Sequence, residues 1–330
     1  MIHREISASE EGRKLARYLE KLLPAAPKSF MYTALRKNKI KVNRKKPGSP
    51  NLILHTGDQS DRDLSPQQET DFGYLSDEDT GNSHHSPDSV LSDPVFTLPV
   101  LYEDPHILVI NKPFGLLSQK SRPEDISASE IARDILRKNG TVFDATFAPS
   151  VVHRLDRNTG GVMIMAKTLP ASQILSEMIR SHSLRKFYTA RVKGCPRQWT
   201  EETLLADLYR KNTKENKAEI SPYERTMDKG GFLKDPSVPE GWSLCALKVK
   251  LVQDLGESSL LEVELLTGKS HQIRAQLAYH GYPILGDGKY NASENTYRQQ
   301  LFASRVEFLG CTGCLSYLEG KIIQAPVPFL

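Results

Sequence analysis

The charged residues of this chain are divided unevenly along its length, and this division constrains the fold more than any other feature of the sequence. Residues 1–57 hold 13 Lys and Arg against 4 Asp and Glu, whereas residues 58–93 hold one Arg against 10 Asp and Glu. Residues 94–330 are nearly balanced, with 30 against 26. A basic head, an acidic strip and a larger body are therefore predicted, and the head is expected to bind a polyanion.

The composition excludes several classes of protein. Hydrophobic residues make up 38% of the 330 residues, enough to build a core. No stretch approaches the roughly 18 consecutive apolar residues of a membrane span. The charged N-terminus lacks the apolar segment of a secretory signal, and four cysteines are too few for a disulfide scaffold. We therefore expect a cytoplasmic protein without a membrane partner.

The head, residues 1–57, has the pattern of a small helical module with a strand. Residues 12–23 place Leu15, Leu19 and Leu22 on one helical face. A second helix is expected over 29–38, with Ser29 as its cap. Residues 39–43 alternate apolar and basic side chains, which predicts a short strand.

A dense basic run lies at the end of this module. Residues 36–46 carry seven Lys and Arg in 11 positions. A charge run is usually a solvated face, but its place on a helix and strand favours a shaped phosphate-binding surface. The candidate RNA-binding residues of the head are Arg36, Lys37, Lys39, Lys41 and Arg44.

Residues 58–95 are polar and acidic and contain few large apolar side chains. Such a segment cannot bury enough surface to offset the entropy of ordering, so a flexible linker is predicted. A solvated spacer is the simpler interpretation. An autoinhibitory segment that mimics RNA and covers the basic head is the alternative.

The body, residues 96–330, is rich in strands. Strands are expected at 106–111, 162–166, 187–192, 244–251 and 260–266, and helices at 127–138, 170–182 and 270–280. Because they do not alternate strictly, we predict an α+β fold with a mixed, mostly antiparallel sheet and flanking helices. The polar stretch 207–241 is expected to be a surface insertion.

The segment VVHRLDRNTGG, residues 151–161, carries the strongest chemical signal. Asp156 lies between an apolar run and a turn signal, and His153, Arg154 and Arg157 flank it. Nearby cations favour the ionised carboxylate, which suits a nucleophile or charge stabiliser. The alternative is an aspartate that caps the turn and pairs with an arginine.

Two further segments hold candidate site residues. In TGKSHQIRAQL (267–277), Ser270 is expected to cap a helix, and Arg274 could hold a carboxylate in fork geometry or be an ordinary surface arginine. In RKFYTARVKG (185–194), Phe187 and Tyr188 must face opposite sides of a strand. One could stack on a base, with basic neighbours such as Lys186 near phosphates, or both could simply pack.

No pattern indicates a metal or a cofactor. Cys311 and Cys314 have no second pair at zinc spacing. The phosphate-binding GxxxxGK[ST] and GxGxxG motifs are absent.

Taken together, four segments resemble the successive motifs of RluA-type RNA pseudouridine synthases. They are LYEDPHILVINKPFGL, HRLDRNTGGVMIMAKT, KFYTARVKG and TGKSHQIRAQLAYHGYPILGDGKYN, and they follow the order and spacing of that family. Residues 12–43 resemble the S4 RNA-binding module that often precedes this catalytic domain. The resemblance implies a pseudouridine synthase fold that isomerises uridine to pseudouridine in RNA without a cofactor or metal.

The resemblance also assigns roles. Asp156 would be the essential carboxylate, Tyr188 would stack on the target base and Arg274 would pair with Asp156. Arg154 would take the place of the flipped uridine, and Ile273 would form part of the apolar wall. The sequence departs from the family at Gly160, Lys269 and Phe302, where Ser, Arg and His are usual.

The S4-plus-catalytic layout resembles members that act on large-subunit (23S) rRNA, so rRNA is the expected partner of a monomeric enzyme. A non-catalytic RNA-binding protein for ribosome assembly is the main alternative, and an RNA glycosidase is a more distant one. The combination of Asp156, Tyr188 and Arg274 favours the enzyme, since a binding module needs no carboxylate in a cleft that attracts phosphate.

Overall fold

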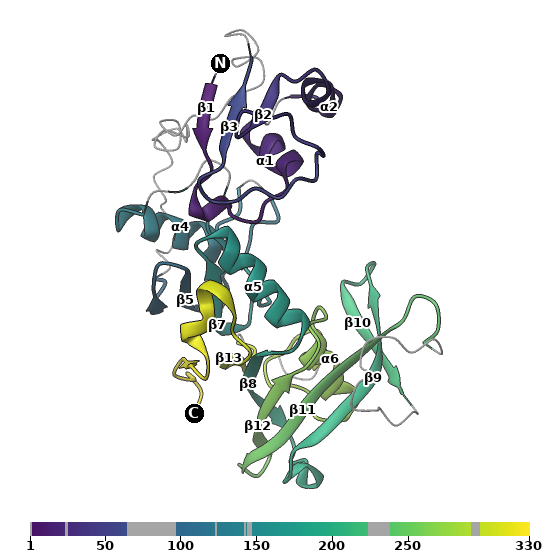
Figure 1. Cartoon of the computed structure of the whole chain (residues 1–330). Helices are drawn as coiled ribbons and strands as arrows, with labels where there is room; N and C mark the ends of the chain where they lie inside the picture. Colours follow the sequence, from purple (N-terminus) through teal and green to yellow (C-terminus); the bar gives the residue numbers. More distant parts are fainter. Residues whose placement is uncertain are drawn as a thin grey trace.

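The computed structural model describes residues 2–23, 26–64, 97–122, 124–141, 143, 147–223, 238–291 and 298–330. Within these ranges the chain forms a three-stranded sheet in the head and an eleven-stranded sheet in the body (Figure 1). The predicted α+β class, with a mixed and mostly antiparallel sheet, is confirmed. None of the helices in these ranges is long and apolar enough to cross a bilayer.

The head combines a small sheet with two helices. Its elements are β1 (Ile2–Glu5), η1 (Ala8–Glu10), α1 (Leu15–Leu22), α2 (Lys28–Arg36), β2 (Ile40–Val42) and β3 (Gln59–Arg62). The leucines of α1 pack on Ile40 and Val42, as their helical spacing predicts. Helix α2 begins after Pro27, so Ser29 lies inside its first turn and is not the cap.

The head extends beyond the boundary expected from the sequence. Strand β3 lies between β1 and β2 and pairs with both in antiparallel register. Its Arg62 is fully buried. Residues 59–62 therefore complete the head sheet, and a boundary at residue 57 would remove its central strand. The strand was not predicted because the segment is acidic and because charged residues such as Asp61 and Arg62 are not expected in a core. Residues 65–95 of the predicted linker lie outside the described ranges.

The body is one large sheet whose spatial order is β10-β9-β11-β12-β8-β13-β7-β5-β4, with β6 beside β7 and β14 beside β13. Its strands are β4 (Val100–Glu103), β5 (Ile107–Lys112), β6 (Ser150–Val151), β7 (Gly160–Ala166), β8 (Leu184–Lys193), β9 (Thr203–Asn212), β10 (Lys217–Pro222), β11 (Ser243–Asp254), β12 (Ser258–Leu265), β13 (Leu301–Phe308) and β14 (Ile322–Gln324). The pair β7–β13 is parallel, and the other pairs are antiparallel.

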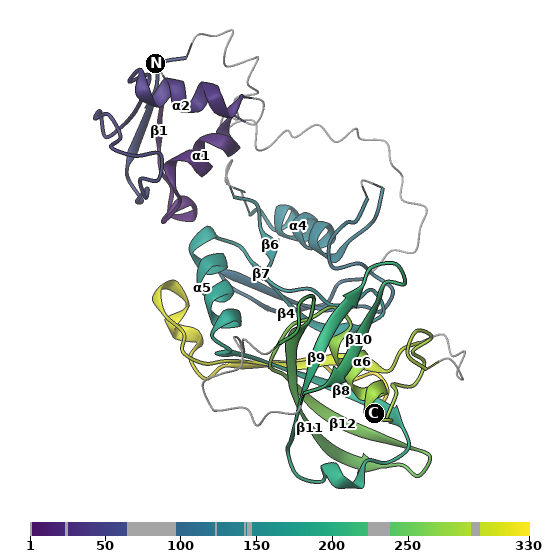
Figure 2. The ribbon, with the colours of Figure 1, turned by 90° about the vertical axis from the view of Figure 1, so that its right-hand side faces the viewer.

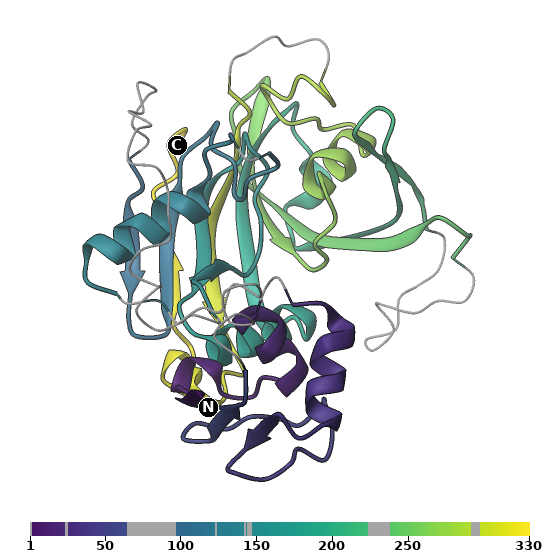
Figure 3. The same ribbon diagram turned by 90° about the horizontal axis from the view of Figure 1, so that it is seen from above.

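Helices cover both faces of the central strands, which explains why those strands are apolar throughout. On β5, Leu108 and Ile110 join the core under α4 (Ala128–Lys138) and α6 (Gln272–Tyr279). Ile107 and Val109 point to the opposite face. There they join the core under α5 (Leu169–Arg180) and η4 (Gly313–Leu318). Helix α6 lies inside the curve of the strands β9 to β12 (Figures 2 and 3).

The prediction of a surface insertion at 207–241 is wrong for the first part of that range. Residues 203–222 form the hairpin β9–β10, which continues the main sheet and pairs with β11. Alternate residues of β9 are buried, including Leu205, Asp207 and Tyr209. The buried Asp207 and the run of lysines hid the alternation expected of a strand. Residues 224–237 lie outside the described ranges.

A glycine makes the parallel β7–β13 contact possible. Gly161 has φ +113°, which side-chain-bearing residues rarely adopt. A Cβ atom there would lie 2.1 Å from the backbone oxygen of Ala303. The two strands can approach this closely only because residue 161 lacks a side chain.

Gly161→Ala is therefore expected to lower the free energy of unfolding by at least about 2 kcal/mol, since backbone strain and a backbone clash add together. Urea denaturation measures this. Gly115→Ala is the control, because Gly115 also has positive φ but has open space around its missing Cβ. If both variants lose the same free energy of unfolding, the close approach of β7 to β13 does not exclude a side chain at residue 161.

Candidate active site

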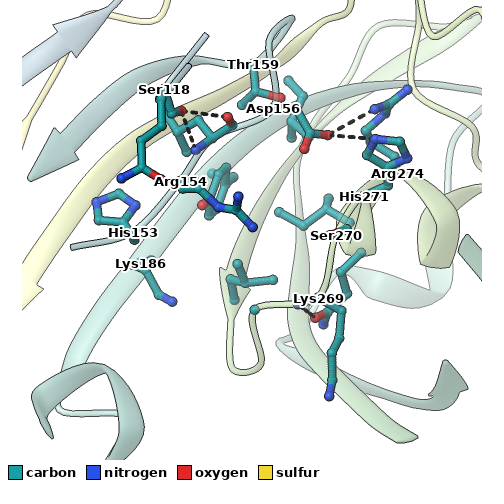
Figure 4. Close-up of a pocket in the computed structure, with 18 of the residues that line it drawn as sticks. Ser118, His153, Arg154, Asp156, Thr159, Lys186, Lys269, Ser270, His271 and Arg274 are labelled. Carbon is teal, nitrogen blue, oxygen red and sulfur yellow. Dashed lines mark hydrogen bonds and ion pairs between the residues drawn. The ribbon is translucent and has the colours of Figure 1, made fainter. Parts of the chain in front are cut away.

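A cavity of about 610 Å³ opens on the α6 face of the sheet. It is lined by the segment 117–121, the loop 152–159, strand β8 and the start of α6. Five of the predicted site residues line it, namely Arg154, Asp156, Tyr188, Ile273 and Arg274. Figure 4 shows Arg154, Asp156 and Arg274 among them. The fold thus brings together three motifs that are far apart in the sequence.

Asp156 lies on the turn between β6 and β7. Its backbone carbonyl closes this turn by accepting from the N–H of Thr159 at 3.0 Å. The side chain faces the cavity, where Oδ2 accepts from Nη1 of Arg274 at 3.0 Å and lies 3.9 Å from Nε2 of His271. The carboxylate therefore pairs with Arg274 across 118 residues of sequence and remains open to the cavity.

The fork of Arg274 binds a different carboxylate from the one predicted. Nε and Nη2 donate to the two oxygens of Asp287, at 2.7 and 2.8 Å, whereas Asp156 receives a single bond. The side chain of Asp287 is fully buried. It also accepts from the N–H of Lys289 at 3.1 Å. Asp287 thus holds the guanidinium in place, so that Nη1 donates to Asp156.

Tyr188 forms one wall of the cavity and is 5% exposed. Burial, reinforced by the Asp156 carboxylate, raises the pKa of Tyr188, so its phenol stays protonated. Phe187 points to the other face, between the guanidinium groups of Arg185 and Arg305. Of the two aromatics considered from the sequence, Tyr188 lines the cavity and Phe187 does not.

His271 is a cavity residue that the sequence did not single out. It precedes α6 in the left-handed conformation, with φ +56°, so the N-cap position belongs to His271 and not to the predicted Ser270. Its Nδ1 lies 3.3 Å from the Tyr290 hydroxyl. Burial lowers the pKa of His271, and the Asp156 carboxylate opposes that shift.

The Asp156 loop is fastened to the segment after β5. The fully buried Lys112 donates from Nζ to the carbonyl oxygens of Pro113, Leu116 and Arg157, at 3.0, 2.8 and 3.2 Å. Burial lowers the pKa of Lys112 to about 7, and the Asp156 carboxylate opposes that shift. The Oγ of Ser118 donates to the carbonyl of Leu155 at 2.7 Å and accepts from the N–H of the same residue at 3.0 Å.

Ser118→Ala is expected to leave both backbone groups of Leu155 without partners, at a cost of about 1–3 kcal/mol in the free energy of unfolding. Because Leu155 precedes Asp156, turnover should also fall, by about tenfold, with little change in RNA affinity. Single-turnover kinetics and thermal melts measure the two effects. Ser118→Thr keeps the hydroxyl and should restore turnover. If it does not, the hydrogen bonds are not what positions the loop.

Two of the departures from the family are neighbours in space. A side chain at Gly160 would meet the ring of Phe302 at 3.1 Å and that of Phe114 at 3.2 Å. The rings of Phe114 and Phe302 pack 5.9 Å apart. The glycine at 160 thus leaves room for the phenylalanine at 302. Lys269, the third departure, lines the cavity.

The five basic candidates of the head do not line this cavity. Arg36, Lys37 and Arg44 are exposed, and Lys39 and Lys41 are half-buried. In the described ranges no group of three or more His, Cys, Asp or Glu is gathered to hold a metal ion.

Comparisons with known proteins identify the family of the chain. Residues 106–279 match the family model described as RNA pseudouridylate synthase. The chain is 26% identical over 331 residues to an uncharacterized RNA pseudouridine synthase of Mycoplasma capricolum, covering 96% of this chain and 95% of that protein. It is 30% identical over 298 residues to ribosomal large subunit pseudouridine synthase C of Salmonella typhi, covering 90% of this chain and 81% of that protein.

Among solved structures, the chain is similar to human RNA pseudouridylate synthase domain containing 4. The TM-score is 0.56 at 21% identity, over 70% of this chain and 89% of that one. A similarity at this level of identity shows the fold.

Proposed function

The chain belongs to the RNA pseudouridylate synthase family, enzymes that isomerise uridine to pseudouridine in RNA, and on that premise we propose that it modifies large-subunit rRNA with Asp156 as the essential carboxylate. Its similarity to ribosomal large subunit pseudouridine synthase C supports the choice of rRNA. The observation that carries the catalytic assignment is the Asp156 carboxylate, open to the cavity and 3.0 Å from Arg274.

The reaction rearranges bonds within one nucleotide. The bond from uracil N1 to ribose C1′ breaks, the base turns, and C5 bonds to C1′. The proton on C5 is lost and N1 gains one, so atoms balance without a cofactor. Asp156 supplies the negative charge, and its electrostatic effect grows when the bound nucleotide displaces water from the cavity.

The uridine has to leave its stack before the carboxylate can reach it. The cavity of about 610 Å³ receives the flipped nucleotide. Tyr188 and Ile273 provide an aromatic surface and an apolar wall for the base. Arg154, exposed at the cavity beside Asp156, fills the space that the uridine leaves in the RNA.

Pseudouridine mapping of rRNA tests this proposal. Cells that lack the protein should lose pseudouridine at one or more positions of the large-subunit rRNA. Wild-type protein should restore the modification and Asp156→Asn should not. Unchanged rRNA combined with lost modification of another RNA would refute the substrate assignment. Restoration by Asp156→Asn would refute the catalytic one.

The head is assigned to RNA binding through its basic residues. Replacing four of them with glutamine should flatten the dependence of RNA affinity on salt, by about 0.7–0.9 in log–log slope for each phosphate that the head no longer binds. The four are Arg36, Lys37, Lys41 and Arg44. Filter binding at several salt concentrations measures the slope, and turnover at saturating RNA should persist.

The control removes the same charge from exposed residues of the body. It replaces Arg137, Lys138, Arg180 and Lys250 with glutamine. If both sets change the slope equally, the head contributes general charge and no particular binding surface. Substitution is preferable to deletion of residues 1–57, because the central strand β3 lies beyond that point.

A further inference from the structure

One lysine in the cavity is buried without a counter-charge. Lys186 is 9% exposed and lines the cavity two residues before Tyr188 on β8. Within the described part of the chain, its Nζ has neither a hydrogen-bond acceptor nor a carboxylate partner. An ammonium group removed from water without such a partner is unfavourable, and binding sites are where such groups are retained.

The neighbouring Arg185 differs in this respect. It faces the other side of the strand, where its guanidinium donates to Glu264 at 2.7 and 2.9 Å and to Glu307 at 2.9 Å. The sequence could not distinguish these two basic residues. Of these two residues, Lys186 lines the cavity and Arg185 does not.

A second hydrogen-bond donor lies beside Lys186. The Nε2 of His153 accepts from the backbone N–H of Ile164 at 3.1 Å, so this nitrogen carries no proton. Burial, together with Lys186, lowers the pKa of His153 to about 3. The ring is therefore neutral and its proton is on Nδ1. No acceptor for Nδ1–H is found among the described residues.

Figure 4 shows His153 and Lys186 on one side of the cavity and Asp156, Arg274 and His271 on the other. The first side offers donors but no carboxylate, since Asp156 is the one acidic residue among the described lining residues. Val152 and Ile179 line the cavity as well, so apolar surface limits screening of a charge bound there.

We propose that Lys186 Nζ and His153 Nδ1–H form a phosphate subsite, which binds a phosphodiester next to the uridine held in the cavity. The proposal rests on the function proposed above. Lys186 and Tyr188 are two residues apart on one face of a strand, about 6.6 Å along it. A base stacked on Tyr188 therefore places an adjoining phosphate within reach of Lys186. A neutral base carbonyl would leave the ammonium charge uncompensated, whereas a phosphate neutralises it.

The test compares Lys186→Met with Lys250→Met. Both remove one positive charge, but Lys250 is exposed on β11 and does not line the cavity. Methionine replaces a desolvated ammonium with an apolar chain of similar length, so Lys186→Met should fold, which a thermal melt verifies. The probe is an RNA oligonucleotide that contains the mapped uridine, made with phosphates throughout or with one neutral methylphosphonate on either side of that uridine.

Lys186→Met should bind the all-phosphate RNA about tenfold or more weakly than wild type, and Lys250→Met should be near wild type. With the methylphosphonate at the contacted linkage, the difference between Lys186→Met and wild type should vanish, because the interaction is already absent. If Lys186→Met matches Lys250→Met, or if neither methylphosphonate removes its effect, the subsite is wrong.

These measurements separate the subsite from the function on which it rests. They report equilibrium binding and need no turnover. Normal pseudouridine formation with no specific loss in Lys186→Met would overturn the subsite alone. A specific binding loss in a protein that forms no pseudouridine would overturn the function and leave the subsite.

Nitrogen-15 NMR of the histidine side chains tests the second donor. His153 should be the neutral Nδ1–H tautomer between pH 6 and 8, and its Nδ1 signal should shift when the oligonucleotide is added. A proton on Nε2, or a signal unchanged by bound RNA, would remove His153 from the subsite.

Discussion

Asp156→Asn is expected to lower the rate of pseudouridine formation by about 10⁴-fold or more while RNA affinity stays within a few-fold of wild type. Asparagine keeps the shape of the side chain but has no negative charge, and losing a residue that acts on the reacting atoms has effects of this order. Single-turnover kinetics and filter binding on the same RNA measure the two quantities.

The control for this variant is Asp104→Asn. Asp104 does not line the cavity and accepts hydrogen bonds from the N–H groups of His106 and Ile107. It should retain turnover. If the turnover of Asp156→Asn is near that of wild type, Asp156 is not part of the mechanism. If its RNA affinity falls strongly, the main role of Asp156 is to bind RNA.

Asp287→Ala is expected to lower the free energy of unfolding by about 3–5 kcal/mol, because it leaves the buried guanidinium of Arg274 without its two-bond partner. Turnover should fall as well, since Arg274 would no longer be aimed at Asp156. Urea denaturation measures the first effect. Single-turnover kinetics at a temperature where the variant is folded measure the second.

Asp254→Ala is the matched control. Asp254 is an exposed aspartate 3.6 Å from Arg197, and such pairs contribute about 0–1 kcal/mol. If both aspartate variants lose the same stability, Asp287 does not hold Arg274. A stable Asp287→Ala with normal turnover would contradict the proposed support.

Motif recognition could assemble the cavity residues, because the turn at Asp156, the strand at Tyr188 and the helix at Arg274 each have a local signature. It could not show which carboxylate receives the fork of Arg274. Asp287 sits in a glycine-flanked loop whose side chain becomes buried only through tertiary packing. A Gly-Asp-Gly sequence ordinarily predicts an exposed turn, so no local signal distinguishes the buried Asp287 from a surface aspartate.

The role of Lys112 and the neutral state of His153, which was expected from the sequence to be one of the cations beside Asp156, could not be predicted for a related reason. Each is polar and each makes its contacts with backbone groups: Lys112 with three carbonyl oxygens and His153 with the N–H of Ile164. Backbone groups are present at every position, so no partner residue marks such contacts in advance. The strands β3 and β9 were missed because buried charged residues interrupt their alternation.

The central position of β13 governs when the catalytic face can form during synthesis. Residues 301–308 join β8, which carries Tyr188, to β7, which follows Asp156. Before they are made, the sheet consists of two pieces with open edges. The head, by contrast, needs nothing beyond Arg62 to close its sheet. Because domains fold in the order of their synthesis, the nascent chain displays its basic head early and gains a uridine site only after residue 308 has been added.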